Sequence, residues 1–119
     1  MAETVKFDDW KKLDLRVGEI KEVNDHPGAD KLLVLKVDIG DEVRTVVAGI
    51  KKYYSKEELI GKKIVLFTNL EQKELRGIKS EGMILAAVQG NDEKIILLSP
   101  EKNINNGSII RWLSKIYFN

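Results

Sequence analysis

The sequence predicts an all-β domain that closes into a small barrel, and three observations support this. Short runs rich in β-branched residues are separated by clusters of turn-forming residues. The first run changes its alternation of apolar residues around Gly18, which is typical of a β-bulge in a strongly bent strand. A single Ser-x-x-Glu capping box, from Ser55 to Glu58, places one short helix between the third and fourth runs.

The N-terminal elements follow from the spacing of apolar residues. Residues 7–13 are predicted to form one helical turn, because an apolar residue recurs every third position and an aspartate stands near the start. The first strand is expected over residues 15–23. The loop that follows, residues 24–30, is rich in residues that favour turns.

The rest of the chain continues as short strands joined by turns. Gly40-Asp41 is expected to form a tight hairpin, since glycine tolerates a positive φ. The helix after Ser55 is expected to end at Gly61, and Asn106-Gly107 marks a late turn. The remaining strands are expected at residues 32–39, 43–48, 63–70, 83–88 and 94–99.

This order of elements is that of an OB-fold, a five-stranded Greek-key barrel, here with a short helix and a C-terminal extension. The 119 residues fit one domain, 1–119, with the barrel core over about 7–100 and the extension over 101–119. OB-folds usually bind oligonucleotides or oligosaccharides, but a fold alone does not fix a function.

Composition restricts the classes of function. With 43% hydrophobic and 33% charged residues, the chain is expected to be soluble and globular. It contains no cysteine, which excludes disulfides, thiolate metal sites and cysteine nucleophiles. No run approaches the roughly 18 apolar residues of a membrane span, so we expect a cytoplasmic protein without a membrane partner. The net charge of +1 is low for a nucleic-acid binder, so RNA contacts need a local arrangement of Lys and Arg.

No residue pattern indicates catalysis, a metal site or a cofactor. His26 is the one histidine, and we interpret it as a solvated turn residue before Pro27. There is no His-Glu-x-x-His pattern and no glycine-rich phosphate loop. Acidic pairs stand at the expected helix starts, where they favour the helix dipole. The sequence therefore predicts a non-enzyme without cofactor.

Two polar segments each have two interpretations. The segment Lys51-Lys52-Tyr53-Tyr54 either supplies phosphate and base contacts or packs one tyrosine while its lysines are solvated, and we favour the second. Residues 69–83 form a long polar connection, either an exposed connector or a functional loop. Three cations and three acids give this connection a formal charge of zero.

Several motifs, in order along the chain, resemble a family of tRNA-binding domains. The family includes the C-terminal domain of methionyl-tRNA synthetases, free-standing structure-specific tRNA-binding proteins and the cytokine-precursor subunit of multisynthetase complexes. The resemblance covers residues 7–112. The motifs are Phe7-Asp8-Asp9-Trp10-Lys11-Lys12-Leu13-Asp14-Leu15-Arg16-Val17-Gly18, His26-Pro27-Gly28-Ala29-Asp30-Lys31-Leu32, the set Asn69-Leu70, Leu75-Arg76-Gly77 and Ser80-Glu81-Gly82-Met83, and Leu97-Leu98-Ser99-Pro100.

The resemblance implies a domain that grips tRNA by its shape near the outer corner of the L, through phosphates and 2′-hydroxyls. It implies RNA contacts from the Ser80 hydroxyl and from Met83, the latter being alternatively a core residue. Gly82 would let RNA or backbone approach closely. Asn69 is expected either to contact RNA or to tie down the long loop. The expected phosphate contacts are Arg16, Lys31, Lys36, Arg76 and Lys79.

The sequence departs from the family where Glu71, Gln72 and Glu74 stand in place of proline and basic residues, which lowers the local positive potential. Because the chain begins at Met1 and lacks a nucleotide-binding domain, we expect a free-standing module or an accessory (beta) subunit delivering tRNA to methionyl-tRNA synthetase. An excised synthetase domain is the alternative. Rival functions are a peptide-binding export chaperone on the same fold and a protein scaffold.

The C-terminal run from Ile109 to Phe118 is too apolar for an exposed tail. It packs either on its own barrel or on a second copy of the chain. Because members of the family tend to be homodimers, the resemblance favours a twofold-symmetric homodimer that uses this region.

Overall fold

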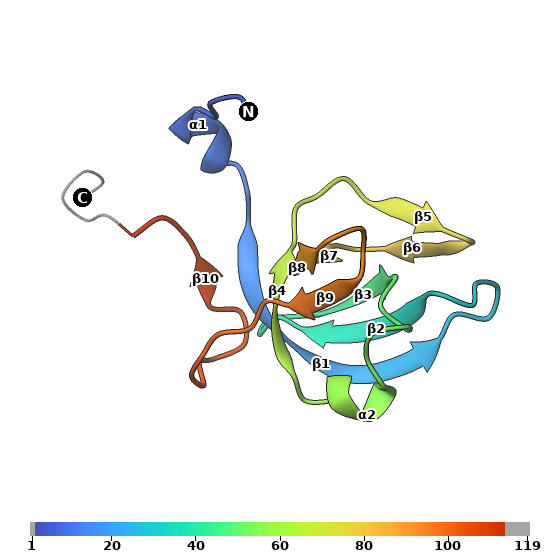
Figure 1. Ribbon diagram of the computed structural model, residues 1–119. Helices are drawn as coiled ribbons and strands as arrows, with labels where there is room; N and C mark the ends of the chain where they lie inside the picture. The colour runs from blue at the N-terminus through green and yellow to red at the C-terminus, as the bar shows by residue number, and fades with distance from the viewer. Residues whose placement is uncertain (1, 114–119) are drawn as a thin grey trace.

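The structure is a computed structural model, and it describes residues 2–113. Its main sheet is antiparallel and curls into a nearly closed barrel (Figure 1). The strand order is β3-β2-β1-β4-β7, and β10 pairs with the start of β1. The strands are β1 (Leu15–Asp25), β2 (Leu33–Asp38), β3 (Val43–Ala48), β4 (Lys63–Phe67), β7 (Met83–Ile84) and β10 (Ile109–Ile110). The predicted all-β barrel is confirmed.

Smaller elements surround the barrel. Helix α2 (Lys56–Leu59) begins with the predicted capping box, in which Ser55 and Glu58 each accept the other's backbone N–H. The predicted N-terminal turn is α1 (Phe7–Trp10), and Gly40-Asp41 forms the expected hairpin, with Ile39 N donating to the Glu42 carbonyl. Two further hairpins pair β5 (Lys73–Leu75) with β6 (Ile78–Ser80) and β8 (Ala86–Gln89) with β9 (Lys94–Leu97).

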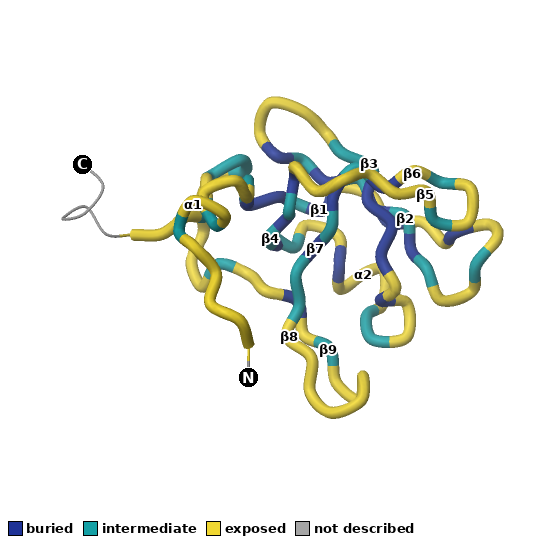
Figure 2. Tube along the Cα trace, turned by 90° about the horizontal axis from the view of Figure 1, so that it is seen from above, coloured by how far each residue is buried: buried dark blue, intermediate teal, exposed yellow. Residues whose placement is uncertain are grey.

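The core is the inner face of the barrel strands. Their alternating apolar residues, including Ile20, Leu35, Val46 and Ile64, are fully buried in one cluster. Figure 2 shows this buried path along the barrel strands, while the outer loops are exposed. Leu59 of α2 joins the cluster, so the short helix covers one end of the barrel.

The predicted bulge at Gly18 is wrong in position. The β1–β4 ladder runs without interruption from Leu15 to Glu19, and the register against β2 shifts between Ile20 and Glu22. Lys21 is therefore the extra residue. In the sequence, the alternation of apolar residues changes before this bulge. The reason is that Leu15 is also buried, on the face of β1 opposite the core cluster.

Where no β-ladder joins β3 to the segment from Ser80 to Gly82, one backbone hydrogen bond and several side-chain hydrogen bonds close the barrel. The free edge of β3 meets the segment from Ser80 to Gly82, and β3 contacts β6 and β7 there. Glu81 N donates to the Thr45 carbonyl at 2.8 Å, and Thr45 N donates to the Glu81 carboxylate at 2.8 Å. Val47 N donates to the Ser80 hydroxyl at 3.0 Å.

Several predicted element boundaries differ from the structure. The long polar connection contains the β5–β6 hairpin, which its mixed charges concealed. The strand expected over 83–88 is divided at Leu85, because Leu85 N bonds to β4 and the Leu85 carbonyl accepts from Leu98 N. The chain there leaves the barrel for the separate β8–β9 sheet. Strand β4 ends at Phe67, and Thr68 donates to the Asp14 carbonyl through both its backbone N–H and its hydroxyl.

The described part of the C-terminal extension packs on the barrel. Val17 N donates to the Ser108 carbonyl, and Gly107 N donates to the Val17 carbonyl. A Cβ at Gly107 would meet the Ile39 carbonyl oxygen at 2.3 Å, so this late turn needs glycine. The domain boundary at residue 100 stays a prediction, and the run 114–118 lies outside the described residues. Among the described residues, no helix is long and apolar enough to span a membrane.

Gly18→Ala is expected to lower the free energy of unfolding by about 1–3 kcal/mol, the usual cost of overpacking a core. The added Cβ would lie 2.5 Å from Cγ1 of Val37, whose β-branched side chain has little room to turn. Urea denaturation measures the loss. Gly49→Ala is the control, since its Cβ would meet only Leu32 at an ordinary 3.7 Å; equal stability of the two variants would contradict the prediction.

Candidate nucleic-acid interface

The β5–β6 hairpin presents positive charge at one end of the molecule. Arg76 and Gly77 form its two-residue turn with φ values of 54° and 91°, the pattern of a type I′ turn. Arg76 therefore stands at the tip, and Lys73 and Lys79 lie exposed on the strands behind it. Figure 1 shows this hairpin at the end of the molecule opposite α1 and β10.

The structure separates the cations of this segment from one of its acids. The hairpin itself carries three cations, Lys73, Arg76 and Lys79, and only one carboxylate, that of Glu74. Glu74 lies opposite Lys79 in the β5–β6 ladder. The Glu81 carboxylate turns toward the barrel and accepts Thr45 N. The hairpin thus has a local positive excess that the formal charge of the whole segment conceals.

Ser80 and Gly82, predicted RNA contacts, lie inside the closure of the barrel. Ser80 is 3% exposed, and its hydroxyl accepts from Val47 N and donates to the Gly82 carbonyl at 2.8 Å. A Cβ at Gly82 would lie 2.9 Å from the Phe67 carbonyl oxygen, so the barrel itself needs this glycine. Met83 follows on β7, half-buried beside Phe67. Direct RNA contact by these residues stays a prediction, whereas their packing is visible.

Arg16 and Asn69 lie near the α1–β1 connection instead of the hairpin. The Asn69 amide accepts Asp14 N at 2.8 Å and donates to the Lys12 carbonyl, so it ties down the long loop, as one of its two interpretations expected. Arg16 Nε donates to the Asp14 carboxylate at 2.9 Å. This hydrogen bond raises the pKa of Arg16 and is the main cause that lowers the pKa of Asp14.

Two further predicted cations lie on or beside β2. Lys31 is exposed in the β1–β2 loop. Lys36 stands on the outer face of β2, where its Nζ donates to the Thr45 hydroxyl at 2.6 Å. Thr45 in turn bonds Glu81, so Lys36 is close to the base of the hairpin.

The interpretation of His26 as a solvated turn residue is wrong. His26 is 5% exposed, and its Nε2 lies 2.9 Å from the Leu75 carbonyl oxygen of the hairpin. Its Nδ1 accepts Gly28 N at 2.9 Å. Burial follows because the β1–β2 loop folds against the hairpin, a contact between residues 49 apart that no local pattern reveals.

The tyrosine segment agrees with the interpretation we favoured. Tyr54 packs against the core, and its hydroxyl accepts Leu97 N at 3.0 Å. The Tyr53 hydroxyl donates to the Asp92 carbonyl at 2.6 Å. Lys51 and Lys52 are exposed.

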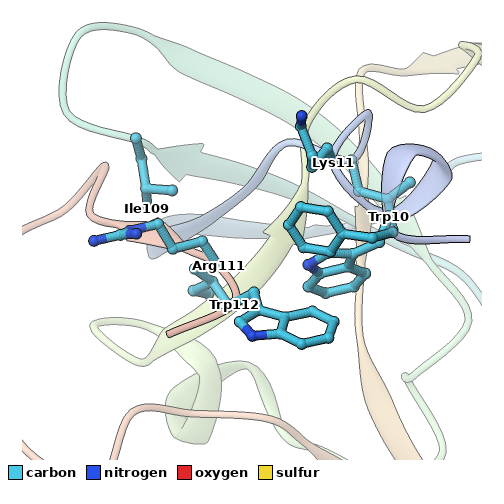
Figure 3. A pocket seen from close by; sticks show the side chains of 8 residues that line it. Trp10, Lys11, Ile109, Arg111 and Trp112 are labelled. Carbon is cyan, nitrogen blue, oxygen red and sulfur yellow. The ribbon is translucent and has the colours of Figure 1, made fainter. Parts of the chain in front are cut away.

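A second surface, which we call the aromatic pocket, lies at the opposite end of the molecule. It is a cavity of about 540 Å³ between α1 and the segment from Ile109 to Trp112 (Figure 3). Phe7 and Trp112 meet edge to face, with ring centroids 4.8 Å apart. Ile109 is 62% exposed and Leu113 is 77% exposed, so this end presents apolar surface to solvent. The lining residues are Phe7, Trp10, Lys11, Leu13, Ile109, Ile110, Arg111 and Trp112.

Comparison with known proteins identifies the family. Residues 15–109 match the family model described as "Putative tRNA binding domain". The chain belongs to this tRNA-binding domain family.

Relatives and solved structures agree with this assignment. The domain is 61% identical over 107 residues to a methionine–tRNA ligase of Pyrococcus abyssi, which covers 90% of this chain and 14% of that protein. The chain therefore spans about one seventh of the length of such relatives. The structure of a MetRS-related protein from Pyrococcus horikoshii aligns with a TM-score of 0.84 at 33% identity, covering 92% of this chain and 99% of that one.

A chaperone has the same fold. The structure of chaperone CsaA from Bacillus anthracis aligns with a TM-score of 0.82 at 32% identity, covering 91% of this chain and 99% of that one. The fold is thus shared by proteins of different described function, so the fold alone does not fix what this domain binds. Among residues 2–113, no group of acidic or histidine side chains is arranged to hold a metal ion.

Ser80→Ala is expected to destabilise the tRNA-binding domain by about 1–3 kcal/mol, because it leaves the buried Val47 N–H without an acceptor. Thermal and urea unfolding measure the effect. Ser108→Ala is the matched control: its hydroxyl donates to the exposed Asn105 carbonyl, so we expect a change below about 0.5 kcal/mol. A Ser80→Ala variant as stable as the control would show that the hydroxyl does not close the barrel.

Proposed function

We propose that this domain binds tRNA by its shape, without a catalytic step of its own, and delivers it to a methionyl-tRNA synthetase. The observation that carries the proposal is the cationic β5–β6 hairpin, with Arg76 at an exposed tip, in a chain of the tRNA-binding family. The likeness to part of methionine–tRNA ligases supports the choice of synthetase.

The chemistry of the hairpin suits RNA backbone. Arginine and lysine neutralise phosphates, and an arginine fork makes paired hydrogen bonds to phosphate oxygens. A ribbon with a tight turn is narrow enough to lie along a backbone, while contacts to phosphate and 2′-hydroxyl carry little sequence preference. Lys31 and Lys36, on the neighbouring loop and strand, extend the same basic surface.

The proposed delivery of tRNA to a synthetase acts through the effective concentration of tRNA near the catalytic subunit. A module that holds tRNA next to a catalytic subunit raises the local tRNA concentration, which strengthens overall binding without new contacts to the catalytic site. Free-standing module and accessory (beta) subunit are both compatible with this mechanism. Co-purification with the synthetase in the absence of RNA distinguishes the subunit from the free module.

Arg76→Ala and Lys79→Ala are each expected to raise the Kd for tRNA by roughly tenfold, equivalent to about 1.4 kcal/mol. Each change should also lower the slope of log K against log salt by about 1, since one phosphate contact is lost. Fluorescence titration of labelled tRNA at several salt concentrations measures both. Lys102→Ala removes the same charge from an exposed loop outside the hairpin and is the control; equal losses in all three variants would indicate nonspecific attraction.

We also propose that the aromatic pocket and the exposed Ile109 and Leu113 form the contact of a homodimer. Apolar surface of this kind is covered when two copies meet through the same patch. A dimer of this form leaves both hairpins free, because they lie at the opposite end of each molecule (Figure 1).

Ile109→Lys is expected to convert the dimer to a monomer, because a charge enters an apolar interface without a partner. Light scattering at micromolar concentration measures the mass. Val88→Lys places the same charge at a similarly exposed residue of β8 and should leave the dimer intact. A wild-type chain of monomer mass overturns the dimer proposal.

Peptide-chaperone activity is the second candidate, and the likeness to CsaA supports it. The same titration decides between the two functions. Preference for tRNA over a duplex RNA control supports the module, whereas binding of unfolded polypeptide with no binding of tRNA at low salt supports the chaperone.

A further inference from the structure

The buried imidazole of His26 joins two parts of the basic surface. It follows the last residue of β1, and its two nitrogens point to different segments. A peptide N–H only donates, so Nδ1, which receives the bond from Gly28 N, carries no proton. Nε2 therefore carries the proton and donates to the Leu75 carbonyl oxygen. The neutral ring uses both of its hydrogen-bonding atoms.

Each of the two segments carries a cation of the proposed tRNA site. On one side is the β1–β2 loop, closed by backbone bonds from His26 N to Leu32 O and from Leu32 N to Ala29 O, with the exposed Lys31 inside it. On the other side, Leu75 directly precedes Arg76 at the tip of the hairpin. Figure 1 shows the loop and the hairpin tip at the same end of the molecule.

The hairpin needs this link because it is short. Only three residue pairs form it, and an isolated two-stranded hairpin is marginally stable in water. Ser80 and Glu81 attach its base to β3. At the tip, the His26 bond to Leu75 holds the turn in place, from a ring that is itself buried.

We propose that His26 is a positioning residue that holds the β5–β6 hairpin and the β1–β2 loop as one rigid surface for tRNA. The inference rests on the proposed tRNA binding and concerns the same site. A hairpin held in its binding geometry loses less conformational entropy when RNA docks, so affinity rises without an added contact. His26 itself does not touch the RNA, because the ring is buried.

Two substitutions separate the two bonds of the ring. In His26→Asn, the side-chain oxygen takes the place of Nδ1 and accepts Gly28 N, but the side chain is too short to reach Leu75. In His26→Gln, the amide nitrogen takes the place of Nε2 and donates to the Leu75 carbonyl. We expect His26→Asn to raise the Kd for tRNA about fivefold, while His26→Gln stays within about twofold of the wild type.

A double-mutant cycle distinguishes positioning from general stability. In the wild-type background Arg76→Ala is expected to weaken tRNA binding roughly tenfold, and in the His26→Asn background by less than about threefold, because the arginine is no longer held in place. We call the fold-change in Kd caused by Arg76→Ala the Arg76 factor. If His26 only stabilises the fold, the Arg76 factor is the same in both backgrounds. Amide hydrogen exchange at residues 75–78 should rise in His26→Asn and not in His26→Gln.

The outcomes separate the inference from the proposed function. If wild-type protein binds no tRNA at low salt, the proposed function fails and the inference fails with it. If wild type binds and His26→Asn binds equally well with an unchanged Arg76 factor, the inference is overturned and the function stands. Should His26→Asn lose cooperative unfolding, His26→Leu keeps the buried volume, removes the same link and undergoes the same comparison.

Discussion

The closure of the barrel between β3 and the segment from Ser80 to Gly82 is the interaction on which the functional surface depends. No ladder of backbone pairs joins these strands, so one backbone bond and three side chains replace it: Ser80, Glu81 and Arg44. Arg44 adds two bonds of 2.9 Å, to the Thr68 and Glu81 carbonyls, across the end of the barrel. Because buried polar groups are costly when unpaired, this closure fixes where the β5–β6 hairpin leaves the barrel.

The closure also arranges the charges. Glu81 is drawn to Thr45 by two hydrogen bonds, which removes one carboxylate from the hairpin face and leaves Arg76 and Lys79 exposed. The same segment that is neutral in sequence is thus basic where it meets solvent. Its other acids, Glu71 and Glu74, remain exposed, so the basic surface is local and the net charge of the chain stays low.

The two ends of the molecule have different characters. One carries cations on a narrow hairpin, tied to the β1–β2 loop by a single buried histidine. The other carries aromatic rings around a cavity, with apolar side chains in solvent. Because these two surfaces lie at opposite ends of the molecule, the proposed tRNA binding and the proposed dimer contact do not compete for the same surface (Figure 1).

Interactions between residues close in sequence allowed several secondary-structure elements of this protein to be predicted from its sequence. The strand β2 with its alternating burial, the β-branched strand β3, the glycine at the Gly40 turn and the capping box of α2 are set by residues a few positions apart, and each is where the sequence predicts it. The motifs that resemble the tRNA-binding family identified it correctly. Long-range pairing decided the rest. Ser80 is buried by a bond to Val47, 33 residues away, and His26 by a bond to Leu75, 49 residues away. Neither partner leaves a mark in the neighbouring sequence, so only the tertiary structure could show which polar residues hold the surface together and which cations remain free to meet RNA.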